Sequence, residues 1–180
     1  MMHELPVMTR EYLERSRRRE QSELTELWDL LDRVRDPELP VLSIWDLGVL
    51  YDLAQVDGKI LITVTPTYSG CPAMETIYSD IEQLLREAGI DSLEIRTQLA
   101  PAWSSTWISP EGSDKLREYG IAPPGDSTAD SDGLTPDAGV VCPRCNSIDT
   151  RCISEFGSTA CKALFQCNAC SEPFDYFKKI

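Results

Sequence analysis

Two pairs of cysteines near the C-terminus have the types and spacing best suited to metal chemistry. Cys142-Pro-Arg-Cys145 and Cys167-Asn-Ala-Cys170 are separated by 21 residues. Two such turns present four thiolates in a tetrahedron, which is the arrangement that Zn²⁺ accepts. A four-sulfur site leaves no open position for water, so we expect zinc to stabilise the fold there and not to catalyse. Iron binds thiolates as well, and an iron-sulfur cluster in place of zinc is therefore an alternative.

Two further cysteines, Cys152 and Cys161, lie between these pairs. They could be small buried residues, additional thiol ligands or a redox pair. Buried filler is the simplest interpretation of Cys152. Cys161 stays open, because it lies in a run of small residues from Gly157 to Ala163.

The seventh cysteine, Cys71, lies in the segment Thr65-Pro-Thr-Tyr-Ser-Gly-Cys-Pro72, where a predicted strand gives way to a predicted helix. The N-terminus of a helix favours an anion, so we expect its thiolate to form at a lower pH than that of a free cysteine. Such a sulfur suits a labile bond to a metal or cluster. The alternative is a buried cysteine that only packs at the helix start.

Charge and composition exclude several classes of function. The formal net charge of -13 and the sequence pI near 4.4 argue against binding to nucleic acid or to an anionic membrane surface, and favour protein partners. Neither an apolar run of ~18 residues nor a secretion signal is evident, so we expect a cytoplasmic protein. The only histidine, His3, cannot supply a catalytic triad or a di-iron site, and no intrinsic catalysis is expected. An arginine cluster at residues 15 to 19 is interpreted as a solvated helix face or tail.

Hydrophobic periodicity predicts the elements that position these cysteines. An α+β fold is expected, with a small three-stranded sheet and helices on one face. The expected elements are a helix over Ser22 to Asp36, a hairpin of Leu47 to Val56 and Lys59 to Thr65 joined at Asp57-Gly58, a helix over Pro72 to Ala88, a strand over Leu93 to Leu99, and a short helix over Ser113 to Tyr119.

Composition divides the chain into parts. We expect an N-terminal extension at residues 1–21, an α+β domain at 22–122, an acidic linker at 123–138 and a β zinc ribbon at 139–180. The linker is rich in Pro, Gly, Ser, Thr and Asp and has too few apolar residues to form a core. The last part is too short for an ordinary hydrophobic core, so metal is the expected substitute.

Three motifs, Asp36-Pro-Glu-Leu-Pro40, Asp46-Leu-Gly-Val-Leu50 and the Cys71 segment, together resemble the metal-sulfur cluster biosynthesis family, once called a domain of unknown function. The resemblance spans roughly Leu24 to Leu99. It implies a small α+β domain in which Cys71 takes part in iron-sulfur cluster assembly or transfer. Asp36 and Glu38 match other signature positions of that family.

Later motifs extend the resemblance over nearly the whole chain, to the D-type subunits of phenylacetyl-CoA epoxidase systems. These motifs are Trp103-Ser-Ser-Thr-Trp-Ile-Ser109, Tyr119-Gly-Ile-Ala-Pro-Pro124, Phe156-Gly-Ser-Thr-Ala-Cys-Lys-Ala-Leu164 and Glu172-Pro-Phe-Asp-Tyr-Phe-Lys178. The resemblance implies an accessory factor that helps to mature the metal centres of the oxygenase and reductase components, which are then the expected partners. An iron-sulfur electron-transfer protein and a structural subunit of the epoxidase are the alternatives.

Overall fold

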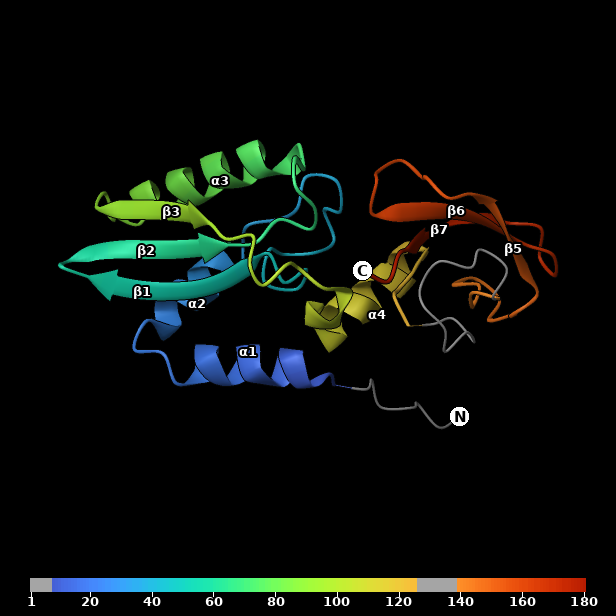
Figure 1. The fold of residues 1–180 in the computed structure, drawn as a ribbon, viewed down its shortest axis with the longest axis horizontal. Helices are drawn as coiled ribbons and strands as arrows, with labels where there is room; N and C mark the ends of the chain where they lie inside the picture. The colour runs from blue at the N-terminus through green and yellow to red at the C-terminus, as the bar shows by residue number, and fades with distance from the viewer. Residues whose placement is uncertain (1–7, 126–138) are drawn as a thin grey trace. The chain divides into compact units, whose positions relative to one another are not determined.

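The computed structural model describes residues 8–125 and 139–180. These residues fall into two compact units, divided after Gly112 (Figure 1). The helices are α1 (Arg10–Glu20), α2 (Thr25–Leu31), α3 (Ala73–Glu87) and α4 (Pro110–Tyr119), with a 3₁₀ turn η1 (Ser105–Trp107). The strands are β1 (Leu50–Val56), β2 (Lys59–Val64), β3 (Leu93–Thr97), β4 (Ile121–Ala122), β5 (Thr150–Ser154), β6 (Lys162–Cys167) and β7 (Pro173–Phe177). None of the helices in these described ranges is long and apolar enough to cross a membrane.

The first unit is built on a three-stranded sheet in the order β1-β2-β3, which confirms the expected α+β fold. β1 and β2 form the predicted hairpin, and Asp57 and Gly58 take the positive φ values, 50° and 78°, that a tight turn of this kind needs. α3 then crosses over the sheet so that β3 pairs parallel to β2 (Figure 1). The apolar face of α3 is buried, with Ile77, Ile81 and Leu85 fully covered.

The prediction for the N-terminal helices is wrong in two respects. α2 starts three residues later than expected and ends at Leu31, because the chain turns there and pairs back on itself, with the Ile44 N–H donating to the Val34 carbonyl at 3.0 Å. The arginine cluster is not merely solvated. It lies on α1, where Arg15 is buried and Arg15 and Arg19 both stack on the ring of Trp45.

The second unit contains a four-stranded sheet in the order β4-β7-β6-β5. β4 was expected to belong to the first domain, but it pairs in parallel with β7 of the ribbon. Grouped by their contacts, the two units divide after Gly112, whereas the domain boundary expected from the sequence lies after residue 122. Most of the predicted linker, residues 126–138, lies outside the described residues.

Candidate functional site

The two cysteine knuckles have the same local structure. The N–H of the first cysteine in each, Cys142 or Cys167, donates to the carbonyl five residues later, Ser147 at 2.9 Å or Glu172 at 3.0 Å. These bonds fold each Cys-x-x-Cys segment into a tight turn whose two sulfurs point the same way. β6 delivers Cys167, and the β5–β6 pairing brings the second knuckle to the first.

The four sulfurs of the ribbon converge on one point. The Sγ atoms of Cys142 and Cys170 lie 3.8 Å apart and those of Cys145 and Cys167 lie 3.5 Å apart. All four lie within 4.8 Å of one another. A zinc ion with bonds of about 2.3 Å places tetrahedral sulfurs about 3.8 Å apart, so these residues fit a single tetrahedral metal ion. The ribbon therefore carries a metal-binding site.

Backbone donors act on one sulfur of this site. The N–H groups of Cys170 and Ala169 donate to Cys167 and lower the pKa of its thiol, whereas burial and the neighbouring sulfurs raise the pKa of Cys145 and Cys170. A metal binds thiolates and not thiols, so its binding must displace the protons that these crowded sulfurs otherwise hold.

The structure keeps Cys152 and Cys161 out of the four-sulfur group. Cys161 is buried, and its sulfur lies 3.0 Å from the Thr159 hydroxyl. Cys152 is half-buried and packs against the ribbon core, which includes Phe165 and Phe174. Neither sulfur is within 4.8 Å of all four knuckle sulfurs in the described part of the chain.

Cys71 lies half-buried directly before Pro72, the N-cap residue of α3. As expected for a helix N-terminus, the Ala73 N–H donates to its sulfur, and so does the Thr67 hydroxyl. The expected low pKa is nevertheless wrong. Burial raises the pKa of Cys71, and the carboxylates of Glu38 and Asp36 raise it further, which together outweigh the two donors.

A short loop brings these carboxylates to Cys71 from far away in the sequence. Oδ1 of the buried Asp36 accepts the N–H groups of Glu38 and Leu39, each at 2.8 Å, and so fixes a tight turn. The Asp36 N–H in turn donates to the Leu42 carbonyl at 3.0 Å. The carboxylates of Asp36 and Glu38 thus lie near enough to Cys71 to raise its pKa, although these three residues do not form a close cluster of metal-ligating atoms in the described part of the chain.

Thr67 was missed by the sequence reasoning, although it stands inside the Cys71 motif. Its only sequence signal is a hydroxyl four residues before the cysteine, which does not by itself reveal a hydrogen bond to sulfur. We call Cys71 with Thr67, Asp36 and Glu38 the Cys71 group, and it differs from the ribbon because it is not a metal cage. Among the residues that the structure describes, only the four ribbon cysteines bring three or more metal-ligating atoms close together.

Comparison with known families matches both units. Residues 24–92 match the family model described as iron-sulfur cluster assembly protein, and residues 126–178 match the PaaD zinc beta ribbon domain. These matches agree with the α+β domain around Cys71 and with the four-cysteine ribbon. They extend over neither α1 nor the segment from β3 to α4.

The similar proteins include two named relatives and one solved structure. A protein of Escherichia coli (strain K12), named as the putative D-type subunit of 1,2-phenylacetyl-CoA epoxidase, is 48% identical over 155 residues, 86% of this chain and 92% of the relative. A "Fe-S protein maturation auxiliary factor" of Porphyromonas gingivalis (strain ATCC BAA-308 / W83) is 32% identical over 48% of this chain and 84% of the relative. The crystal structure of a DUF59 domain from Bacillus anthracis is 30% identical over 51% of this chain and 89% of that chain, with a TM-score of 0.47. The chain belongs to the family of D-type phenylacetyl-CoA epoxidase subunits, in which an iron-sulfur cluster assembly domain is joined to a zinc ribbon.

Proposed function

We propose that this chain helps to mature the metal centres of a phenylacetyl-CoA epoxidase system, and that Cys71 is the residue that handles the cluster. The observation that carries the proposal is the position of the half-buried Cys71 at the N-terminus of α3, within electrostatic range of Asp36 and Glu38 on a separate loop. The family match and the maturation factor among the relatives support the same role. We propose the reductase and oxygenase components as the recipients.

The chemistry around Cys71 favours a transient bond to iron. Sulfur must lose its proton before it binds iron, and burial with two nearby carboxylates makes the bare thiolate unfavourable. The same carboxylates attract a cation. Cys71 would therefore lose its proton only when iron takes the proton's place. The remaining ligands of the cluster would come from the protein that donates or receives it. Such a one-sulfur attachment suits transfer better than storage.

The ribbon, by contrast, suits permanent zinc. The four sulfurs lie within 4.8 Å of one another, as expected around one ion. A cluster would spread its thiolates over two or more iron atoms and hold them farther apart. We propose that Cys142, Cys145, Cys167 and Cys170 hold zinc, which would stabilise the ribbon and leave no open position for catalysis.

The decisive experiment replaces Cys71 by serine in cells that grow on phenylacetate. Serine is close to cysteine in size, so we expect the Cys71→Ser protein to fold and to keep its ribbon metal. The reductase and the oxygenase are then purified from these cells, and their iron and sulfide contents are measured. We expect iron-deficient components. Cys152→Ser is the matched control, since it removes a half-buried thiol outside both groups and should leave both components loaded.

Fully loaded reductase and oxygenase in the Cys71→Ser strain would refute the maturation role. If epoxidase activity were lost despite full loading, the chain would instead be an electron-transfer or structural subunit of the complex. An absorbance spectrum of anaerobically purified protein distinguishes an electron-transfer subunit from a structural one, because a permanent iron-sulfur cluster is coloured and zinc is not.

A further inference from the structure

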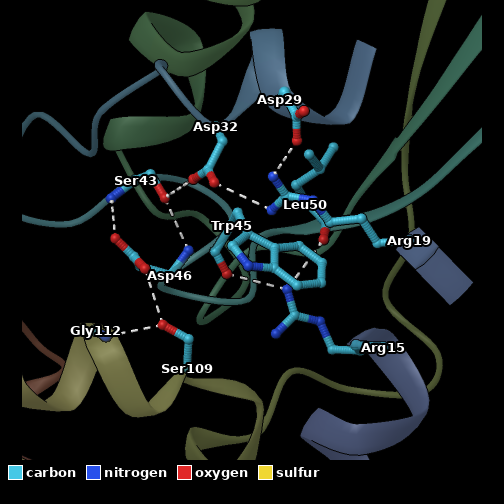
Figure 2. Close-up of polar contacts among 10 residues, drawn as sticks. All are labelled: Arg15, Arg19, Asp29, Asp32, Ser43, Trp45, Asp46, Leu50, Ser109 and Gly112. Atoms are coloured by element: carbon cyan, nitrogen blue, oxygen red, sulfur yellow. Dashed lines mark hydrogen bonds and ion pairs between the residues drawn. The ribbon is translucent and has the colours of Figure 1, made fainter. Parts of the chain in front are cut away.

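We infer that Ser43 and Asp46 are positioning residues for the Cys71 group: they fix the loop that carries Asp36 and Glu38 to the cysteine. The inference rests on the proposed function only for its consequence in cells. The geometry itself is a continuous set of hydrogen bonds that starts on α1, passes through the base of this loop and ends at the first turn of α4 (Figure 2).

Ser43 is the centre of the set. Its hydroxyl donates to Oδ1 of Asp32 at 2.5 Å and accepts the N–H of Asp46 at 2.9 Å, so both its donor and its acceptor are used. The other carboxylate oxygen of Asp32, Oδ2, accepts a hydrogen bond from the guanidinium of Arg19 on α1 at 3.1 Å. Ser43 is 1% exposed, which shields these bonds from competition by water.

Asp46 continues the set on the other side (Figure 2). Its Oδ2 accepts the Ser43 N–H at 3.2 Å and its Oδ1 accepts the Ser109 hydroxyl at 2.9 Å. Ser109 in turn accepts the Gly112 N–H at 2.8 Å and so caps the start of α4. Gly112 is closely packed there, because a Cβ at this position would lie 3.0 Å from the Ser109 hydroxyl and 3.1 Å from Asp46 Cβ, so a larger residue would need a neighbour to shift.

The loop that carries Asp36 and Glu38 is anchored directly on Ser43. Arg35 forms an isolated β-bridge with Ser43, and the next residue, Asp36, donates its N–H to Leu42. A change in the position of Ser43 is therefore passed through one residue pair to the turn that holds Glu38. Buried side chains that are fully hydrogen-bonded have one favoured geometry, and this is what a positioning role needs.

The test compares two alkylating reagents on Cys71, neutral iodoacetamide and anionic iodoacetate. In both reactions the sulfur forms a thioether and iodide leaves. Both need the same thiolate, so the ratio of the two rates cancels the protonation of Cys71 and reports the negative charge near it. Peptide mass spectrometry of the metal-loaded protein gives the rates for Cys71 alone. Glu38→Gln is the positive control and should raise the iodoacetate-to-iodoacetamide ratio roughly threefold.

We expect Ser43→Ala and Asp32→Ala to raise the ratio in the same direction, because each frees the loop base. Asp29→Ala is the matched control, since Asp29 binds the same Arg19, at 2.7 Å, but makes no hydrogen bond to Ser43. Ile81→Val controls for stability, because it weakens the buried face of α3 and removes no member of the hydrogen-bonded set. Both controls should keep the wild-type ratio. The half-exposed Asp32 keeps the test usable if Ser43→Ala does not fold.

A wild-type ratio in folded Ser43→Ala and Asp32→Ala would overturn the inference, and so would an equal rise in Asp29→Ala or Ile81→Val. The maturation assay then separates the two proposals. If the ratio rises while the iron content of the reductase and oxygenase stays full even in Cys71→Ser cells, the positioning role stands and the proposed function fails.

Discussion

Asn146 and Ser171 take the same left-handed backbone conformation, with φ values of 60° and 64°, each directly after the second cysteine of its knuckle. The two halves of the metal site are thus equivalent in structure although their sequences differ. Only glycine adopts this conformation without cost, whereas a β-branched side chain is strained there.

Ser171→Val should therefore weaken the ribbon. The strain of a β-branched residue at positive φ costs about 1–2 kcal/mol, which corresponds to roughly tenfold weaker zinc binding, because metal binding and ribbon folding are coupled. Competition with a chromogenic chelator measures this affinity. Ser171→Gly removes the side chain without strain and should bind zinc at least as tightly as the wild type. Equal affinity of the Val and Gly variants would contradict this account.

Cys145→Ser should abolish stoichiometric metal binding. Cys145 is exposed, so its replacement removes a ligand without removing core packing. The expected result is less than one metal ion per chain by elemental mass spectrometry, with faster protease cleavage of residues 139–180. Cys152→Ser should retain one ion per chain. A fully loaded Cys145→Ser protein would show that this thiolate is not a ligand.

Local signals explain why the hairpin and α3 could be predicted from the sequence. Asp57-Gly58 specifies a turn by itself, and the apolar spacing from Met74 to Leu85 specifies a buried helix face. The burial of Arg15 could not be predicted in this way. Four nearby arginines indicate a solvated face, and only the folded chain shows that the carbonyl of Trp107, far away in sequence, accepts one of them.

The Cys71 group shows the same limit within a single motif. The sequence correctly placed Cys71 at the start of a helix, from which the Ala73 N–H donates to it. The predicted direction of the Cys71 pKa shift is wrong. Burial and the carboxylates of Asp36 and Glu38 raise the pKa, and the approach of these carboxylates depends on the fold of a separate loop. Motif resemblance could group the three residues, whereas periodicity and spacing could not.

The pH dependence of Cys71 alkylation should show the raised pKa. A thiol reacts as its thiolate, so a pKa above the usual value of 9.0 shifts the rate curve to higher pH. Glu38→Gln removes one charge that raises the pKa and should move the curve back toward neutral pH. Iodoacetamide rates between about pH 7 and pH 11, resolved for Cys71 by mass spectrometry, measure the shift. Glu82→Gln, an exposed change farther along α3, should leave the curve in place. A Glu38→Gln curve identical to the wild type would show that this carboxylate does not act on Cys71.

Arg15→Met should destabilise the first unit strongly. The Arg15 guanidinium donates to the carbonyl of Trp107, to that of Trp45 at 3.1 Å and to that of Leu50 at 3.4 Å, and it stacks on the Trp45 ring at 4.3 Å. Methionine keeps much of the apolar stem but leaves buried carbonyls without donors, which costs about 3 kcal/mol. Urea unfolding measured by tryptophan fluorescence gives this loss.

Arg17→Ala is the matched control for Arg15→Met, because Arg17 lies on the exposed face of the same helix and should change the free energy of unfolding by less than about 0.5 kcal/mol. The pair tests whether α1 is a structural part of the first unit or a dispensable extension. If Arg15 contributed only the burial of its apolar stem, methionine would replace it with little loss of stability, since its side chain is similarly apolar and unbranched. A large loss in Arg15→Met beside a negligible one in Arg17→Ala therefore identifies the three buried carbonyls as the reason for arginine at this position, and equal small losses would return α1 to the role of a solvated extension.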